Sequence, residues 1–376
     1  MVWKDSKSVP ITEYMYQKAS KAKIPLSGTF ELTPMCNFSC KMCYVRKTFE
    51  EVRIHTREML TLEHWLKIAE EAKNEGMLEL LLTGGEPLLW PNFWKLYEKL
   101  SKMGFLLSIN TNGSLIDEKA IEYFKQMPPK RINITLYGAS DETYEQLCHV
   151  KNVFKKVDYA ISELKRVGIN VKLNGTLTPY NVKDLEKIVE YSKEKDLRLN
   201  ITTYMFPPLR RDKRMIGVNE RFTAQEAARY RLKSFYLQNG KDNYLKYLES
   251  IMNNTIYPVG LKEVCTDNDD GIVRCRAGRA TFWITWDGWI TPCGMMPEPQ
   301  IELRKKKFKD AWKELVQVTS EIRLSGACEK CQNRMTCHSC AAMDYAETGR
   351  FSGIPKYLCE MTLEMRKIAS EELANM

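Results

Sequence analysis

The chain has 376 residues, of which 44% are hydrophobic and 28% charged, and 57 Lys and Arg against 48 Asp and Glu give a formal charge of +9. This length exceeds the roughly 250–300 residues at which a single core stops growing, so we expect one large domain and at least one smaller unit. Charged residues interrupt every apolar run, and the opening MVWKDSKSVPITEYM lacks an apolar signal region, which excludes a transmembrane helix and predicts a cytoplasmic protein.

From residue 28 to about residue 207 the sequence alternates β-rich runs with helical periods, after an N-terminal extension at 1–27. The six predicted strands are 28–32, 77–82, 105–110, 131–137, 169–177 and 197–205. Several are nearly continuously apolar and β-branched, which is typical of parallel strands covered on both faces. The predicted helices cover 62–76, 91–102, 117–126, 153–167 and 181–195, with Thr61 as an N-cap and Gly104 and Gly168 as C-caps. We therefore expect an α/β domain with a parallel sheet, open or curled toward a barrel, and active-site loops at the carboxyl ends of its strands.

The character of the chain changes after Pro207 and Pro208. Segment 208–264 starts basic and irregular and contains a predicted helix at 223–253, so we interpret it as a bridge. Segment 265–376 is rich in Cys, Gly and Trp with little periodicity, which is typical of a small unit organised by metals. A final helix is predicted near 361–374.

The chain contains twelve cysteines, and cytosolic thiols stay reduced, so metal ligands or catalytic groups are favoured over disulfides. Three cysteines lie within 36–43 and eight within 265–359. Cys148 stands apart and is most simply a buried apolar residue. A redox or metal function is thus divided between the two ends of the chain.

Cys36, Cys40 and Cys43 place three thiols within eight residues, directly after the first predicted strand. A structural zinc site normally takes four protein ligands, whereas three thiolates on a four-iron cluster leave one iron free for a substrate or cofactor. The alternative is a zinc site completed by His55, which has no second ligand beside it in the sequence.

The spacing C-x3-C-x2-C, followed by the aromatic Tyr44, resembles the signature of radical S-adenosylmethionine (SAM) enzymes. The segment 84–87 at the end of the second predicted strand resembles the GGEP motif of the same family, whose backbone groups contact the methionyl amine of SAM. Its glycines permit close backbone approach. The resemblance covers residues 28–207 and implies the fold of the family, a partial (β/α)6 barrel of the TIM type.

The resemblance assigns these residues to SAM: Tyr44, Gly84, Gly85, Glu86, Asn112, Thr135 and Met205. Thr135 stands where the family has a small hydroxyl residue that meets the ribose. Met205 is placed to contact the adenine, or else belongs to the barrel core. Asn110 and Asn112 are polar candidates at the end of the third strand, although Asn-Gly also indicates a turn. An arginine of the family has no counterpart here, and no catalytic residue is assigned.

The later cysteines have a second spacing, C-x12-G-x4-C around Gly288 and then C-x2-C-x5-C-x2-C with a last cysteine at 359. It resembles the SPASM domain, except that two residues instead of three separate Cys337 from Cys340. The resemblance implies two auxiliary [4Fe-4S] clusters, which makes three such clusters in all. It assigns to the first Cys265, Cys275, Cys293 and Cys340, and to the second Cys328, Cys331, Cys337 and Cys359. A pair of zinc ribbons is the alternative, and His338 is expected at the surface.

The resemblance also implies the chemistry. The open iron binds SAM, and homolysis yields a 5′-deoxyadenosyl radical that removes a hydrogen atom from the substrate, so the protein must exclude solvent and hold the target C–H bond. Eight ligating thiols leave no open iron in the auxiliary clusters, which favours a role in electron transfer. An electron donor such as flavodoxin or ferredoxin is the implied partner.

Barrels joined to SPASM domains resemble maturases that oxidise or crosslink peptides and proteins. Anaerobic sulfatase maturases carry an acidic base directly after the cysteine of G-x4-C, where this chain has Gly294. A maturase of ribosomally made peptides, forming a crosslink, a thioether or an epimerised centre, is therefore favoured. The leader-binding domain common in such maturases does not fit before the first strand, so we expect a separate leader-binding partner or a leader-independent mode. Segment 281–286 either lines a peptide channel or, as we favour, forms a hydrophobic hairpin.

Three other functions stay open: a sulfatase-maturase-like protein oxidase, an RNA-modifying radical SAM enzyme, and a noncatalytic zinc protein. The basic segments 210–214 and 304–307 are compatible with RNA, although charge runs are usually solvated surface. Eleven thiolates and three 2+ clusters would lower the charge to about +4, which argues against nucleic acid as a partner. No membrane partner is expected.

Overall fold

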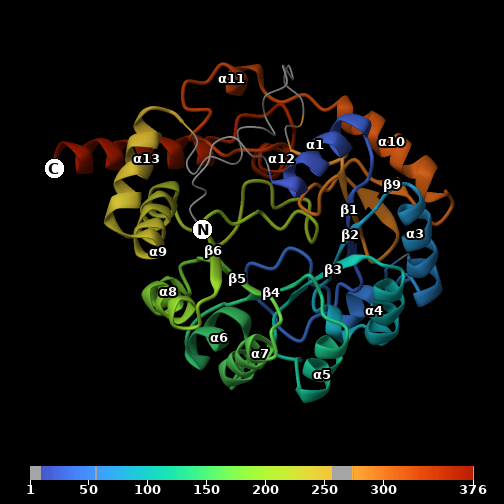
Figure 1. Ribbon diagram of the computed structural model, residues 1–376. Helices are drawn as coiled ribbons and strands as arrows, with labels where there is room; N and C mark the ends of the chain where they lie inside the picture. The colour runs from blue at the N-terminus through green and yellow to red at the C-terminus, as the bar shows by residue number, and fades with distance from the viewer. Residues whose placement is uncertain (1–9, 56, 256–272, 274, 376) are drawn as a thin grey trace.

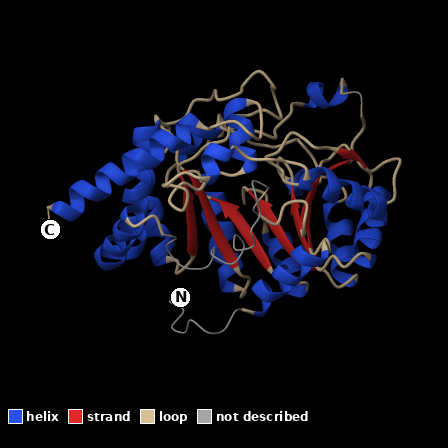
Figure 2. Cartoon of the chain, turned by 90° about the horizontal axis from the view of Figure 1, so that it is seen from above, coloured by secondary structure: helices blue, strands red, loops and turns tan. Residues whose placement is uncertain are grey.

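A curved sheet of nine strands runs through the structure, with helices along its outer side (Figure 1). The computed structural model describes residues 10–55, 57–255, 273 and 275–375, so Cys265 lies outside the described residues. The strand order is β6-β5-β4-β3-β2-β1-β7-β8-β9. The view from above in Figure 2 shows the strands in one curved row, with C-terminal loops and helices over one end.

All six predicted strands are present, with ends within a few residues of the prediction, and they pair in parallel. They are β1 (Ser27–Glu31), β2 (Glu79–Thr83), β3 (Leu106–Thr111), β4 (Arg131–Thr135), β5 (Val171–Thr176) and β6 (Arg198–Thr202). The α/β fold with a parallel sheet is thereby confirmed, and the sheet is curled rather than flat.

The predicted helices of this region are also present, and Gly104 and Gly168 follow two of them with φ of 87° and 83°, as C-cap glycines do. These helices are α3 (Leu62–Asn74), α4 (Phe93–Lys102), α5 (Glu118–Gln126), α7 (Phe154–Arg166) and α8 (Leu185–Glu194). Four short or terminal elements were not predicted: α1 (Ile11–Ala22), α2 (Phe49–Arg53), η1 (Pro87–Leu89) and α6 (Asp141–Cys148). The helix predicted at 181–195 begins with the short η2 (Val182–Asp184) and continues as α8.

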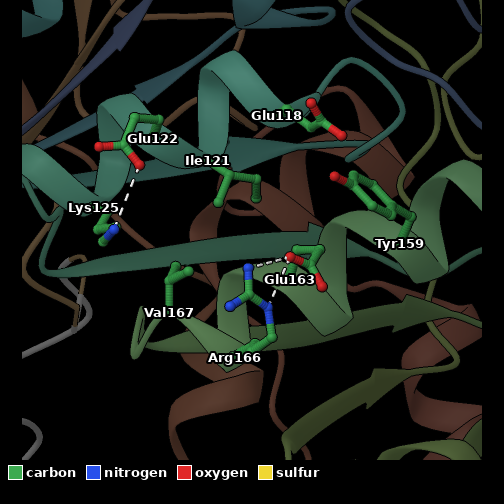
Figure 3. A pocket seen from close by; sticks show the side chains of 8 residues that line it. All are labelled: Glu118, Ile121, Glu122, Lys125, Tyr159, Glu163, Arg166 and Val167. Carbon is green, nitrogen blue, oxygen red and sulfur yellow. Dashed lines mark hydrogen bonds and ion pairs between the residues drawn. The ribbon is translucent and has the colours of Figure 1, made fainter.

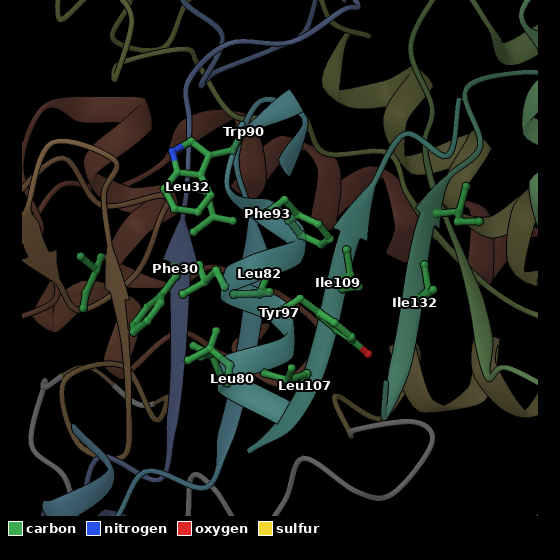
Figure 4. Packing of buried hydrophobic residues seen from close by; sticks show 14 of the residues in the cluster. Phe30, Leu32, Leu80, Leu82, Trp90, Phe93, Tyr97, Leu107, Ile109 and Ile132 are labelled. Carbon is green, nitrogen blue, oxygen red and sulfur yellow. The ribbon is translucent and has the colours of Figure 1, made fainter. Parts of the chain in front are cut away.

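The main hydrophobic core lies between the sheet and its outer helices. Figure 4 shows side chains of β1 to β4 packed beside those of α4, including Phe30, Leu80, Leu82, Ile109, Ile132, Phe93 and Tyr97. Because successive strand residues point to opposite sides, the residues that alternate with these face the inside of the curve. The helical side therefore determines the fold, and the inner side remains for a site.

Three strands from the C-terminal part extend the same sheet. They are β7 (Thr281–Ile284), which pairs in parallel with β1, and the antiparallel β8 (Trp289–Thr291) and β9 (Ile301–Glu302). The hairpin expected at 281–286 is thus present, but it joins the barrel sheet, and α10 (Phe308–Ser320) packs into the main core. The boundaries of the four segments stay predictions, yet sheet and core cross the boundary at residue 265.

The bridge helix α9 (Ala224–Met252) folds back on itself at Gly240. Tyr236 and Tyr244 have ring centroids 5.4 Å apart, whereas eight residues of straight helix rise about 12 Å. The single helix predicted at 223–253 is therefore corrected to two arms, and α13 (Lys356–Ala374) packs against them in a second core. Neither α9 nor any other helix in the described part of the chain is long and apolar enough to cross a membrane.

One buried ion pair connects the segment after β6 to α12 (Ala341–Thr348), which follows the short α11 (Gly326–Glu329). The Glu347 carboxylate accepts hydrogen bonds from Arg221 at 2.6 and 2.8 Å and from the Tyr204 hydroxyl at 2.7 Å. Arg221 also stacks 3.7 Å from the centre of the Tyr357 ring. The side chains of Arg221 and Glu347 are at most 7% exposed. If one of the two charges is removed by mutation, the remaining charge therefore stays buried away from water.

Glu347→Gln should lower the free energy of unfolding by about 3–5 kcal/mol, because the Arg221 charge then stays buried without a counter-charge. Urea unfolding followed by tryptophan fluorescence measures this change. The matched control is Glu142→Gln, whose partner Lys183 lies in an exposed ion pair, and its effect on stability should be much smaller. Equal losses in both variants would contradict the structural role of the buried pair.

Candidate active site

The loop after β1 carries Cys36, Cys40 and Cys43, and backbone amides point at two of its sulfurs. The N–H of Phe38 donates to Cys36 Sγ at 3.3 Å, and that of Arg46 donates to Cys43 Sγ at 3.2 Å. Hydrogen bonds to cysteine sulfurs are one means by which proteins set the potential of an iron–sulfur cluster. The donor set of this loop therefore fits the cluster that the spacing predicts.

The end of α6 holds this loop in place. The N–H groups of Ser39 and Lys41 donate to the carbonyls of Cys148 and Leu147, at 2.9 and 3.0 Å. Cys148 is fully buried, as predicted, but its thiol also faces Cys40, and this contact lowers the pKa of Cys40. The isolated cysteine of the sequence is thus a direct neighbour of a predicted ligand.

His55, the alternative fourth ligand, has other contacts in the structure. Its ring packs against Trp286 with centroids 4.8 Å apart, and its Nδ1 lies 3.2 Å from the backbone nitrogen of Arg57. His338 is exposed, as predicted. These placements give the zinc interpretation of the first three cysteines no structural support.

The GGEP segment packs directly on the backbone that leads into the cysteine loop. The N–H of Gly85 donates to Thr33 O at 2.7 Å, and that of Glu86 donates to Met35 O at 2.9 Å. A Cβ atom on Gly84 would lie 2.5 Å from Thr33 O, and one on Gly85 would lie 2.3 Å from Met35 O. Only glycine therefore allows the two loops to approach this closely.

Glu86 is completely buried, and its carboxylate is directed to the end of β3. It accepts hydrogen bonds from Thr111 Oγ1 and the Asn112 N–H, both at 2.8 Å. Burial raises the pKa of Glu86 to about 7, although these hydrogen bonds act in the opposite direction. The Asn112 amide in turn donates to Asn37 Oδ1 at 2.9 Å and lies 3.8 Å from Cys36 Sγ. Glu86 and Asn112 thus position the cysteine loop, and their predicted contact with SAM stays a prediction.

The other predicted SAM residues surround the same interior region. Thr135 is the last residue of β4 and is half-buried, and Met205 is buried after β6. Burial raises the pKa of Tyr44, with smaller influences from Arg210 and Glu31. The structure brings these side chains to the carboxyl ends of the strands, where the predicted site lies.

A buried polar cluster beside Tyr44 was missed by the sequence reasoning. Glu31 is fully buried, and Arg210 donates to both of its oxygens, at 2.7 and 2.8 Å. The indole N–H of Trp283 also donates to Glu31, at 2.8 Å, and Arg210 reaches the carbonyl of Gly294 at 3.3 Å. The available signal was a glutamate at the end of a predicted buried strand, where an unpaired charge is not tolerated.

The C-terminal thiols fall into two groups. Cys275 and Cys293 both influence the pKa of Cys340, which burial raises to about 12. The pKa of Cys359 is raised to about 11 by burial and then by the thiols of the second group, Cys337, Cys328 and Cys331. No three His, Cys, Asp or Glu side chains of the described residues lie close enough to hold one metal ion. The two ligand sets stay predictions, and Cys265 lies outside the described residues.

Amide donors also point at sulfurs in both of these groups. The N–H of Met295 donates to Cys293 Sγ at 3.5 Å, and that of Asn333 donates to Cys331 Sγ at 3.4 Å. The same type of contact is therefore present in all three thiol regions. This donor chemistry fits iron–sulfur clusters at each of them.

A separate surface groove lies on the outer side, between α5 and α7 (Figure 3). Its charged groups pair with one another, Lys125 with Glu122 and Arg166 with Glu163. The groove is lined by residues of α5, α7 and Val167 and includes none of the predicted site residues.

Comparison with known proteins agrees with this geometry. Residues 30–192 match the model of the Radical SAM superfamily. An AdoMet-dependent heme synthase of Methanosarcina barkeri is 23% identical over 86% of this chain and 93% of its own length. A GTP 3′,8-cyclase of Aliarcobacter butzleri is 30% identical over 46% of this chain, and the match spans only about half (54%) of the cyclase.

Two solved structures share the fold. Streptococcus suis SuiB bound to precursor peptide SuiA has a TM-score of 0.65 at 18% identity, over 96% of this chain and 83% of SuiB. Native anSMEcpe with bound AdoMet has a TM-score of 0.63 at 17% identity, over 93% of this chain and 98% of anSMEcpe. Residues 30–192 are thus a radical SAM domain.

Proposed function

We propose that this protein is a radical SAM oxidoreductase with a SPASM-type C-terminal region that modifies a ribosomally made peptide. The observation that carries the proposal is the presence of three separate thiol groups, each with an amide N–H directed at a sulfur. The fold shared with SuiB, which was solved with a precursor peptide, supports a peptide as substrate. A [4Fe-4S] cluster at Cys36, Cys40 and Cys43 would supply, with SAM, a 5′-deoxyadenosyl radical.

The described residues would prepare this site in three ways. The close contact of the GGEP loop fixes the cysteine loop, and Glu86 aligns the end of β3 beside it. The half-buried Tyr44 lies near Arg210 and Glu31, beside the cysteine loop. Arg210 is neutralised by Glu31 of β1 and also donates a hydrogen bond to the carbonyl of Gly294 in the C-terminal region, so it connects the two parts of the chain.

The C-terminal thiols would hold two auxiliary clusters that accept the second electron when the peptide is oxidised. Arg210 connects the two sides directly, since it bonds Glu31 of β1 and the residue after Cys293. Arg211 next to it donates to the Cys43 carbonyl at 3.2 Å. A flavodoxin or ferredoxin would supply the first electron, and a separate protein would bind the leader peptide.

The sulfatase-maturase-like alternative requires an acidic base after Cys293, and the structure has no room for it. A Cβ atom on Gly294 would lie 2.6 Å from the Trp283 ring. Trp283 thus occupies the space that such a side chain would need. An RNA substrate is also disfavoured, because Arg210, Arg304 and Lys306 of the basic segments are used in contacts within the protein.

A second candidate is the activity of the heme synthase relative, because that match extends over 86% of this chain and 93% of the relative. Anaerobic incubation with SAM and a tetrapyrrole precursor, followed by absorbance and mass spectrometry, tests it. Formation of heme in this assay would replace the peptide proposal.

Cys36→Ala should reduce iron from about 12 to about 8 atoms per chain and lower 5′-deoxyadenosine formation to background, since one of three four-iron clusters is lost. Iron analysis and chromatography of the dithionite-reduced, anaerobically reconstituted protein measure both. Cys148→Ala is the matched control and should keep about 12 irons. Retention of all the iron in the Cys36 variant would contradict the assignment.

Cys328→Ala should also remove about four irons, but its effect on turnover should differ. Because the second electron then lacks an acceptor, the ratio of 5′-deoxyadenosine formed to peptide modified should rise at least about tenfold. Mass spectrometry of the peptide expressed from a neighbouring short reading frame provides this ratio. An unchanged ratio would show that the auxiliary clusters do not take part in electron transfer.

Gly294→Asp should lower stability by about 1–3 kcal/mol without creating formylglycine activity, because the new side chain overlaps Trp283. Thermal unfolding measures the loss. Gly326→Asp is the matched control, since no atom lies within 4 Å of its Cβ position, and it should change stability much less. A stable Gly294 variant that oxidises a sulfatase peptide would restore the alternative.

A further inference from the structure

Three consecutive strands carry the same five-residue pattern, a cation, an Asn and a Thr at alternate positions. The sequences are RINIT at 131–135 in β4, KLNGT at 172–176 in β5 and RLNIT at 198–202 in β6. The pattern has the period of a strand, so its polar members share one face.

That face is the inner side of the curved sheet. Ile132, Leu173 and Ile201 alternate with the polar residues and pack into the cores beneath the helices. Figure 4 shows Ile132 among these core residues. The cations, amides and hydroxyls of the three strands therefore face the inside of the barrel, with the cations at the starts of their strands. Lys172 is level with Arg198 on one side and with Asn133 on the other. Arg131 lies two residues nearer the start of β4 than Asn133.

The cations of this face are close to one another and lack acidic partners. Lys172 and Arg198 are register neighbours on β5 and β6. Burial and then the nearby Arg131 and Arg198 lower the pKa of Lys172. In the described part of the chain none of the three forms an ion pair with a carboxylate. Because like charges on facing positions destabilise a sheet, the arrangement calls for an anionic ligand.

Two buried atoms on the same face also lack partners among the described residues. They are Oδ1 of Asn133, a residue only 7% exposed, and Nε of Arg131. The Asn133 amide nitrogen is engaged, because it donates to Asn110 Oδ1 at 2.7 Å. A free acceptor beside free cations suits a ligand that has both N–H donors and negative charge, and a peptide with acidic side chains has both.

We propose that the inner face of β4, β5 and β6 binds an acidic segment of the substrate peptide, with its carboxylates on Arg131, Lys172 and Arg198 and a backbone N–H on Asn133. The proposal rests on the proposed function in taking the substrate to be a peptide. The cations lie four residues, or about 13 Å, below the carboxyl ends of their strands. An extended peptide that reaches from them to the radical site therefore places its acidic residue about four to six positions from the modified residue.

Binding of fluorescein-labelled hexaglutamate to the reconstituted full chain, measured by anaerobic fluorescence anisotropy without SAM, tests the proposal. The variant Arg131→Gln/Lys172→Gln/Arg198→Gln should bind at least about tenfold more weakly. The matched control Lys119→Gln/Lys155→Gln/Lys187→Gln removes the same charge from exposed positions on α5, α7 and α8, and its affinity should change less than about twofold. Circular dichroism verifies that both variants fold.

Equal weakening in the two triple variants, or none in the first, would overturn the proposal. Citrate binding more tightly than hexaglutamate at equal ionic strength would also overturn it, in favour of a small polycarboxylate. If the first variant does not fold, Arg198→Gln replaces it, since Arg198 is exposed, with an expected loss of at least about threefold. Because SAM is absent, a failure of the radical chemistry leaves this result unaffected and is detected separately as missing 5′-deoxyadenosine.

Discussion

The site depends on the close approach of two backbone segments, the GGEP loop after β2 and the strand exit that leads to the cysteine loop. Gly84 and Gly85 lie so near Thr33 and Met35 that a methyl group on either glycine would overlap a carbonyl oxygen. Two backbone hydrogen bonds close this contact. A wider separation of these two segments would move the cysteine loop relative to β2 and β3. The position of the three thiols in the site therefore depends on both glycines.

Glu86 extends this constraint to a third strand, at an energetic cost. A fully buried carboxyl is expensive unless it is hydrogen-bonded, and here donors from Thr111 and Asn112 compensate only in part, since burial still raises its pKa to about 7. In exchange, the end of β3 and the Asn112 amide are held beside Cys36. The GGEP motif therefore also connects the loop after β2 with the cysteine loop and with the end of β3.

The elements that the sequence predicted well are those determined by local patterns. The strands were recognised from apolar runs, and the helices from Thr61 and the capping glycines, because period and capping act within a few residues. The fold-back of α9 was missed since nothing but Gly240 indicates it. The pairing of β7 with β1 joins segments about 250 residues apart, and no local pattern encodes such a contact. The Glu31 and Arg210 pair was missed for the same reason, although the thiol spacings were visible.

The distribution of basic residues shows why net charge was a weak guide to function. The runs at 210–214 and 304–307 stand out in the sequence, yet Arg210 serves Glu31 and Arg304 bonds the Asp287 carbonyl. Arg131, Lys172 and Arg198 have no carboxylate partner in the part of the chain that the structure describes, and each precedes an Asn by two residues. They lie in strands that also supply isoleucines and leucines to the cores. Successive side chains of a strand point to opposite faces of the sheet. In a curved parallel sheet one face can therefore pack against the helices while the other binds the ligand. A repeated polar pattern on neighbouring strands is therefore more informative about a binding face than a run of like charges.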